Sequence, residues 1–252
     1  MNAIEDNAFS RAFRQLGKEL PRPRAVLCVS AHWWTEGSLL TAAPQPRTIH
    51  DFGGFPPALH AVQYPAPGDP ALAEQVRALL DASGAAAAPV ELDLEWGLDH
   101  GAWSVLIHLY PEADVPVVQL SLDARLSGAG HLALGQTLRP LRDEGVMILG
   151  SGNITHNLSD AFAQMGASQP VTPAWARAYE AAATAALEAR DSEALLALWP
   201  DGPDARQAHP HPDHWFPLLY AYGASDAADT LRFPVEGFDL GSLSMRAALW
   251  EA

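Results

Sequence analysis

Two shortages in this chain, of cysteine and of positive charge, narrow what it can be. Cys28 is the only cysteine, so no disulfide can form within the chain and a reduced, cytoplasmic location is expected. Lysine and arginine number 15 against 30 aspartate and glutamate residues, which gives a formal net charge of −15. Because nucleic acids and anionic membranes attract basic surfaces, neither is expected as a partner.

Long apolar runs are also scarce. No stretch is apolar over the roughly 20 residues that a membrane-spanning helix needs. The opening MNAIEDNAFSRAF has no apolar core of the kind found in signal peptides. Hydrophobic residues still make up 48% of the chain, which is enough for a real core, and residues 1–252 are expected to form one domain.

The order of the apolar segments predicts an α/β fold. Short runs of β-forming residues alternate with helical patterns, which is typical of a mostly parallel or mixed central sheet flanked by helices. Two further strands are expected in a hairpin-like return near the C-terminus. The other predicted strands are 25–30, 38–43, 90–95, 115–122 and 146–152, and the predicted helices are 3–20, 70–83, 102–109, 128–143, 172–199 and 214–224.

Four histidines stand just beyond predicted strands or at the start of a helix: His32, His100, His156 and His214. In open α/β sheets, ligands bind at the carboxyl ends of the strands. Neutral imidazole is the commonest metal-ligating side chain, so several imidazoles at this edge indicate a metal site. Each histidine also has an ordinary interpretation, because a half-buried ring bonded to a backbone carbonyl or a simple turn would place it equally well.

The neighbours of these histidines suggest how they are held. Asp99, which precedes His100, is expected to fix the tautomer of that ring. Gly150 and Gly152 would let the backbone approach a ligand closely. The polar residues just before His156, Asn153 and Thr155, are expected to cap a helix.

The other histidines carry weaker signals. His209, His211 and His214 form a proline-rich cluster compatible with metal ligation or with a solvated loop, and His214 is favoured because it opens a helix. Asp51 and Tyr64 are candidates for the entrance of the site. The remaining histidines are expected to be peripheral: His50, His60, His108 and His131. Of these, His108 and His131 fall on predicted helices and are expected to be surface or filling residues.

Other common chemistries lack their sequence motifs. The chain has no GxSxG elbow, no P-loop, no GxGxxG after a strand and no HExxH. Cys28 lies in the middle of a predicted strand with no obvious base, which argues against a thiol nucleophile. A histidine-rich metal site in an aromatic pocket therefore remains.

Six stretches, in order, closely resemble the DODA-type (4,5-DOPA) extradiol ring-cleavage dioxygenases, which are class III, LigB-like enzymes. The resemblance covers about residues 1–248. It is carried by SAHWWTEG, TIHDFGGFPPALHAVQYPAPGDPALA, GLDHGAWSVLIHLYPEADVPVVQLSLD, GSGNITHNL, HPDHWFPLLYAYGA and PVEGFDLGSLSM.

The resemblance implies the LigB-like fold and an enzyme that opens a catechol ring with O₂, using Fe(II) in turnover and often holding Zn(II) as isolated. His32 and His214 would be metal ligands. His156 would be the acid–base group during turnover and a further ligand in a zinc form, and His100 would contact the substrate. Three neighbours would complete the substrate pocket: Trp33, His50 and Phe52.

One family motif has no counterpart in this chain. Family members begin with a strand that ends in a motif like GHGSPM, whose histidine is a metal ligand. The initial methionine of this chain aligns with the last residue of that motif, so the first strand and one ligand are expected to be missing. A misassigned start is the preferred explanation, because losing one central strand leaves neighbouring backbone groups unpaired. The alternative is a short chain with an incomplete metal site.

Two other function classes stay open on the sequence alone. A zinc hydrolase would need a base, and Glu36 and Glu95 are the carboxylates nearest to the histidines in sequence. A non-catalytic binding protein on the same fold is the other class. The sequence does not name the catechol, the native metal or the oligomeric state.

Overall fold

The structure is a computed structural model that describes residues 2–251, and its centre is a five-stranded mixed sheet with the order β3-β2-β4-β1-β5. The central strand β1 (Ala25–Thr35) pairs in parallel with both β4 (Val117–Asp123) and β5 (Val146–Ser151). The short strands β2 (Leu39–Thr41) and β3 (Glu91–Asp93) pair in parallel with each other, while β2 meets β4 antiparallel. The predicted α/β class with a mostly parallel or mixed sheet is confirmed.

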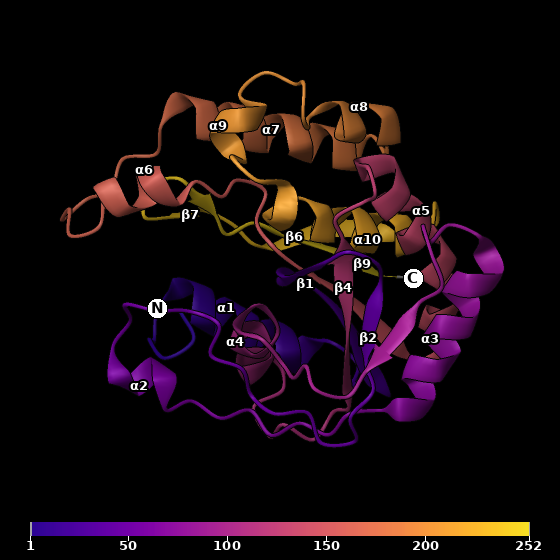
Figure 1. Cartoon of the computed structure of the whole chain (residues 1–252). Coiled ribbons are helices and arrows are strands. Elements are labelled where there is room, and N and C mark those ends of the chain that lie inside the picture. The colour runs from indigo at the N-terminus through magenta and orange to yellow at the C-terminus, as the bar shows by residue number, and fades with distance from the viewer. Residues whose placement is uncertain (1, 252) are drawn as a thin grey trace.

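Alternation along β1 divides the core between the two faces of the sheet. Leu27 and Val29 point to one face, while Val26 and Cys28 point to the other, as the period of two in a strand requires. The first face packs against α3 (Pro70–Ser83), α5 (Gly128–Leu138) and α10 (Phe216–Ala224). The second packs against α1 (Ala8–Glu19) and α4 (His100–Leu109), as Figure 1 shows.

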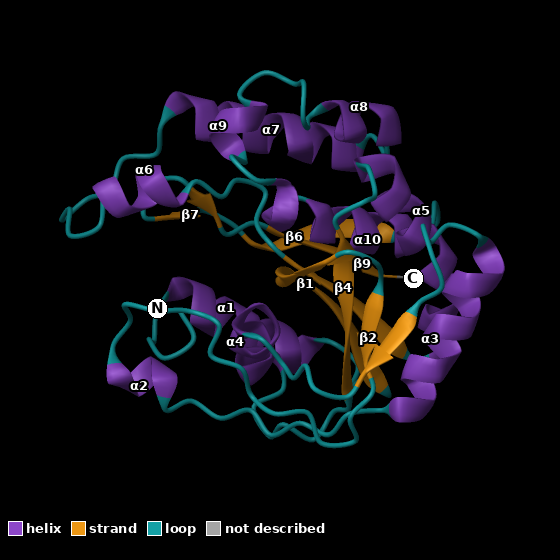
Figure 2. Ribbon diagram, viewed as in Figure 1, coloured by secondary structure: helices purple, strands orange, loops and turns teal. Residues whose placement is uncertain are grey.

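An outer helical layer covers α10 on the side away from the sheet (Figure 2). It contains α7 (Ala174–Glu188), α8 (Ser192–Ala197) and α9 (Ala205–Ala208). The predicted helix over 172–199 is therefore two helices. Three short helices were not predicted from the sequence: α2 (Pro57–His60), α6 (Leu158–Ala163) and α9. Of these, α6 contributes Leu158 and Phe162 to the lining of the cavity described below.

The C-terminal segment is more divided than the predicted pair of strands. β6 (Thr230–Val235) and β9 (Ala247–Glu251) form one antiparallel ladder, and β7 (Phe238–Asp239) and β8 (Leu243–Ser244) form a second within the connection. This inner ladder brings residues 242–246 against the loop that follows β5. The C-terminal segment thus becomes a wall of the site.

Among residues 2–251, β5 pairs with β1 alone, and its other edge faces a large cavity. The cavity, about 1590 Å³, lies between β5, α1, α4 and β9 and reaches the carboxyl ends of β1 and β5. None of the helices within residues 2–251 combines the length and apolar character needed to cross a bilayer.

Candidate metal and catalytic site

The four singled-out histidines lie together at one end of this cavity, although the chain separates them widely. The ring centroids of His32 and His100 are 3.8 Å apart, and those of His32 and His214 are 5.0 Å apart. The rings of His156 and His214 stack with centroids 3.4 Å apart and planes within 5°. All four side chains line the cavity.

His32 owes its position to an irregularity in β1. The strand does not end at Ser30 as predicted but continues to Thr35, with the pairing to β4 shifted between Val29 and Trp34. Such a bulge re-aims side chains, and His32 lies inside it. The Ser30 hydroxyl accepts the His32 amide at 3.2 Å, which fixes the local backbone.

His100 begins α4, and a buried network behind it holds the start of that helix. Asp99 caps the helix and accepts hydrogen bonds from the Ser30 hydroxyl at 2.7 Å and from the Gln119 side chain at 2.8 Å. A Cβ at Gly101 would lie 2.3 Å from Ser30 Oγ and 2.9 Å from His32 Cδ2. Only glycine therefore allows α4 to approach His32 this closely.

The carboxylate that contacts the His100 ring is Asp51 and not Asp99, which corrects the sequence-based assignment. Asp51 Oδ2 lies 2.8 Å from His100 Nδ1 and 3.5 Å from His32 Nδ1, and Asp51 Oδ1 accepts the His100 amide at 2.8 Å. Asp99 is turned away because its oxygens are used by the helix cap and by Ser30 and Gln119. The ring was predicted to have a carboxylate partner, but sequence proximity named the wrong residue.

The loop carrying His156 is fixed differently from the prediction. Asn157, and not Asn153 or Thr155, caps α6. Thr155 instead donates its hydroxyl to Ser242 O at 2.8 Å, and Asn153 reaches His214.

The two glycines before that loop approach protein backbone and not a ligand. A Cβ at Gly150 would lie 2.2 Å from Pro217 O, and one at Gly152 would lie 2.3 Å from His214 O. They let β5 pack against the start of α10 and against the short 3-10 helix Pro212–His214 that precedes it.

Burial lowers the pKa of three of the clustered imidazoles, His32, His156 and His214, and so favours their neutral form. It lowers the pKa of His156 to about 3, and it holds the pKa of His214 well below its usual value, with the nearby His156 and His32 rings adding to the effect. Burial and the adjacent His100 also lower the pKa of His32. Burial alone would raise the pKa of Asp51, but its hydrogen bonds with His100 outweigh this and leave the pKa below its usual value. Neutral imidazoles beside an ionised carboxylate form a donor set suited to a divalent metal.

Of the three predicted pocket neighbours, Phe52 alone lines the cavity within residues 2–251, with its ring 5.2 Å from that of His100. Trp33 is buried and stacks on Trp96 at 5.4 Å, on the other side of the strand from His32. His50 places Nε2 2.9 Å from Val62 O and packs behind Phe52. The sequence positions of Trp33, His50 and Phe52 could not show which of the three side chains lines the cavity.

The remaining candidates lie elsewhere. Tyr64 is buried and donates to Tyr110 O at 2.9 Å. His211 is exposed, whereas His209 is fully buried with Nε2 2.8 Å from Ile154 O. Neither Glu36 nor Glu95 is among the described residues that line the cavity, so the hydrolase hypothesis gains no base from them.

Two histidines expected to be peripheral are in fact buried. His108 places Nε2 2.8 Å from Asn2 O, and His131 places Nδ1 3.0 Å from the Tyr220 hydroxyl. Both serve as filling residues, the second of the two predicted possibilities.

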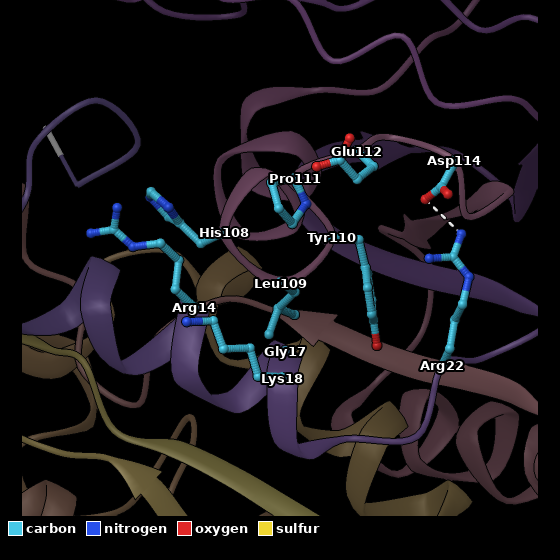
Figure 3. Close-up of a pocket in the computed structure, with 10 residues that line it drawn as sticks. All are labelled: Arg14, Gly17, Lys18, Arg22, His108, Leu109, Tyr110, Pro111, Glu112 and Asp114. Carbon is cyan, nitrogen blue, oxygen red and sulfur yellow. Dashed lines mark ion pairs between the residues drawn. The ribbon is translucent and has the colours of Figure 1, made fainter.

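A second, smaller hollow lies between α1 and the end of α4 (Figure 3). Its volume is about 280 Å³, and its lining is mixed in charge. Arg22 pairs with Asp114 at 2.6 Å, and Arg14 pairs with Asp6. Because both arginines of the hollow are already paired and the four singled-out histidines lie elsewhere, the histidine-lined cavity is the better candidate site.

Known proteins resemble this chain over nearly its whole length. Residues 4–239 match the family described as the catalytic LigB subunit of aromatic ring-opening dioxygenase. A protein of Escherichia coli (strain K12) named 4,5-DOPA dioxygenase extradiol is 46% identical over 97% of this chain and 89% of its own length. A protein of the same name from Beta vulgaris is 39% identical, over 97% of this chain and 90% of its own. A crystal structure of an uncharacterized Escherichia coli K12 protein superposes with a TM-score of 0.81 at 39% identity, covering 97% of this chain and 93% of the other.

Proposed function

We propose, because this chain belongs to the LigB family of aromatic ring-opening dioxygenases, that it cleaves the ring of a DOPA-like catechol beside its two hydroxyls, with O₂ as the oxidant. The extradiol ring-opening activity is shared with the named relatives, whereas the catechol itself is our proposal. The observation that carries the proposal is the convergence of four histidines on one cavity beside Asp51.

For the metal we propose His32 and His214 as ligands, with Fe(II) in turnover and Zn(II) possible in isolated protein. Their rings are 5.0 Å apart and nearly perpendicular, at 87°, so their nitrogen lone pairs can converge. The bound metal would supply the Lewis-acid and redox chemistry that O₂ activation at a catechol needs. The neutral state of the buried rings supports this assignment.

For His156 we propose the acid–base role in preference to ligation. Its ring is parallel to that of His214 and stacked on it with centroids 3.4 Å apart, so the in-plane lone pairs of the two rings lie in separate parallel planes and do not meet at one ion. The neutral imidazole can accept the proton of a substrate hydroxyl and return it later, because the oxyanion left beside it would raise the low pKa that burial gives the free ring. General acid–base catalysis of this kind contributes about 10²–10⁴-fold.

His100 and Phe52 would bind the substrate. Asp51 orients the His100 ring through Nδ1, which leaves Nε2 for a substrate oxygen. Phe52 meets that ring edge-on and gives the catechol an apolar wall. Trp33 and His50 are too far behind this wall to be retained in the substrate set.

A second ligand set shares His32 and has its own support. One donor atom from each of His32, Asp51 and His100 lies within 4.8 Å of the other two. Two histidines and one carboxylate are the ligand types of many non-haem iron oxygenases. We rank this set second because Asp51 Oδ2 is already held by His100 Nδ1 at 2.8 Å.

The test is oxygen uptake by protein loaded anaerobically with Fe(II), using L-DOPA, caffeate and protocatechuate, with resorcinol as the non-chelating control. We expect uptake and a yellow ring-opened product with at least one catechol and none with resorcinol. His156→Ala should keep its metal and lose turnover. Loss of metal in that variant would make His156 a ligand, and retained turnover would end its acid–base role.

A further inference from the structure

Hydrogen bonds join the loop between β5 and α6 to the C-terminal segment, and a residue of the same loop is hydrogen-bonded to His214. Thr155 donates its hydroxyl to Ser242 O at 2.8 Å and accepts the Ser244 amide at 3.1 Å. The Asn153 side-chain amide donates to Ser244 O at 2.8 Å. These bonds fix the position of residue 153 from outside its own loop.

The bond to Ser244 decides which way the Asn153 amide faces. A backbone carbonyl only accepts hydrogen bonds, so the atom 2.8 Å from Ser244 O is the Asn153 nitrogen. The Asn153 oxygen therefore faces His214 Nδ1, at 3.1 Å. An amide oxygen is an acceptor, so His214 Nδ1 carries the hydrogen and Nε2 keeps its lone pair.

Asn153 also holds the backbone of the same histidine. Its main-chain amide donates to His214 O at 3.0 Å. Two bonds from one residue thus fix both the main chain and the ring of His214. The pair are 61 positions apart in sequence, so nothing local enforces this geometry.

The carbonyl that orients Asn153 is itself anchored by a buried carboxylate. Glu180, on α7, is 8% exposed and accepts the Ser244 hydroxyl at 2.7 Å. Arg246 Nε lies 3.4 Å from the same carboxylate. A charge in this location is costly unless it is paired and hydrogen-bonded, as it is here. The anchor connects the outer helical layer to the edge of the site.

We propose that Asn153 is a positioning residue that selects the Nδ1–H tautomer of His214, and that Ser244 and Glu180 hold Asn153 in that orientation. The proposal rests on the proposed function only in giving His214 Nε2 a metal to bind. Outer-shell partners of metal-ligating histidines typically change metal affinity or activity by about 10–100-fold.

The first test reads the tautomer in metal-free protein at neutral pH, by ¹⁵N NMR of labelled histidines assigned with His214→Gln. We expect His214 in the Nδ1–H form in the unaltered protein and a mixed or Nε2–H form in Asn153→Leu. Asn153→Asp loses the donor to Ser244 O but keeps an oxygen that can accept from His214 Nδ1, so it should keep the Nδ1–H form. It also covers the case that the leucine variant does not fold. Two outcomes would overturn the proposal: His214 stays in the Nδ1–H form in Asn153→Leu, or His214 is not in the Nδ1–H form in the unaltered protein.

The second test measures the dissociation constant for Zn(II) by chelator competition. Asn153→Leu should weaken binding about 10–100-fold, with Asn153→Asp recovering most of the loss. Asn157→Leu is the matched control, because Asn157 lies in the same loop and bonds Gln207 O, but its hydrogen bonds involve no histidine side chain. An equal weakening in Asn157→Leu would mean that the loop matters only structurally.

The two proposals can fail separately. If the tautomer shifts as expected while no catechol is consumed, the positioning role stands and the ring-cleavage proposal fails. If catechols are cleaved and the tautomer of His214 is indifferent to Asn153, only the positioning role is lost.

Discussion

Two groups of histidines in this molecule have different surroundings. His32 and His214 line the cavity at the carboxyl edge of the sheet, each with one ring nitrogen beside a polar side chain. His131 and His209 are wholly enclosed between helices and the sheet. Within residues 2–251, His131 Nε2 and His209 Nδ1 have no hydrogen-bond partner, and aromatic rings pack against both imidazoles.

The difference teaches that burial alone does not identify a functional histidine. Burial lowers the pKa of His131 and of His209 to about 4, and it lowers that of His156 to about 3. What separates the groups is that His32 and His214 line an open cavity and each has Nδ1 beside a side-chain oxygen, that of Asp51 for His32 and that of Asn153 for His214. A perturbed pKa thus becomes informative only together with a cavity and an orienting partner.

Removing a cavity histidine should give the largest effect. We expect His32→Ala and His214→Ala each to lose bound metal and turnover. The loss should exceed the effect of replacing a residue that only hydrogen-bonds a ligand, which is about 10–100-fold. The measurement is metal content by elemental analysis beside oxygen uptake. His131→Gln is the control from the other group and should keep its metal at neutral pH. Full metal occupancy in both alanine variants would erase the distinction between the groups.

Asp51→Asn should come next and separates the two ligand sets. If Asp51 only orients His100, metal content should stay near that of the unaltered protein while turnover falls by about 10–100-fold. If Asp51 is a ligand, metal affinity falls as well. Titration with Zn(II) in parallel with oxygen uptake decides between the two, and a variant unaffected in both would remove Asp51 from the site.

The enclosed histidines should make the free energy of unfolding depend on pH in the acid range. The folded-state pKa of His131, about 4, lies below its unfolded value of 6.5, so below pH 6.5 the unfolded chain binds the extra proton first. Stability is therefore complete above about pH 6.5 and is lost as pH falls toward 4, by up to about 3 kcal/mol. Urea unfolding across this range should show a shallower pH slope in His131→Gln than in the unaltered protein. An equal slope would mean that this ring is accessible to protons in the fold.

The smallest effect is expected at His211, which belongs to neither group. Its ring is exposed and contacts Trp34 and Asp213, so His211→Ala should leave metal content unchanged and stability within about 0.5 kcal/mol. Thermal melting and elemental analysis check this. Metal loss in this variant would extend the site along the HPHPDH segment beyond His214.

Much of the architecture could be read from local patterns. The Asp69–Pro70 start of α3, the buried runs of β1 and β4 and the strand β5 are found as predicted, because caps, proline and apolar runs act within a few residues. The short helix α6 was missed because its six residues carry no long periodic pattern. The extension of β1 through His32 was missed because a bulge has no signature in a single apolar run.

The residue types at the site could be predicted from the sequence, but the hydrogen-bond partners of the site histidines could not. The positions of His32, His100, His156 and His214 after apolar runs indicated that they would share one edge, since parallel strands end together. Asp99 was chosen as the partner of His100 because it is adjacent, yet backbone geometry commits Asp99 to capping its own helix.

The sequence by itself determined the alternation of strands and helices, the charge of the chain, and the placement of four imidazoles near strand ends or a helix start. These follow from forces between neighbours in the chain. Only the tertiary structure decided that Asp51 meets His100 across 49 positions, that Asn153 meets His214 across 61, and that His131 and His209 are sealed inside. The physical reason is that a hydrogen bond depends on distance and direction in space, which packing of the whole chain sets and local pattern does not.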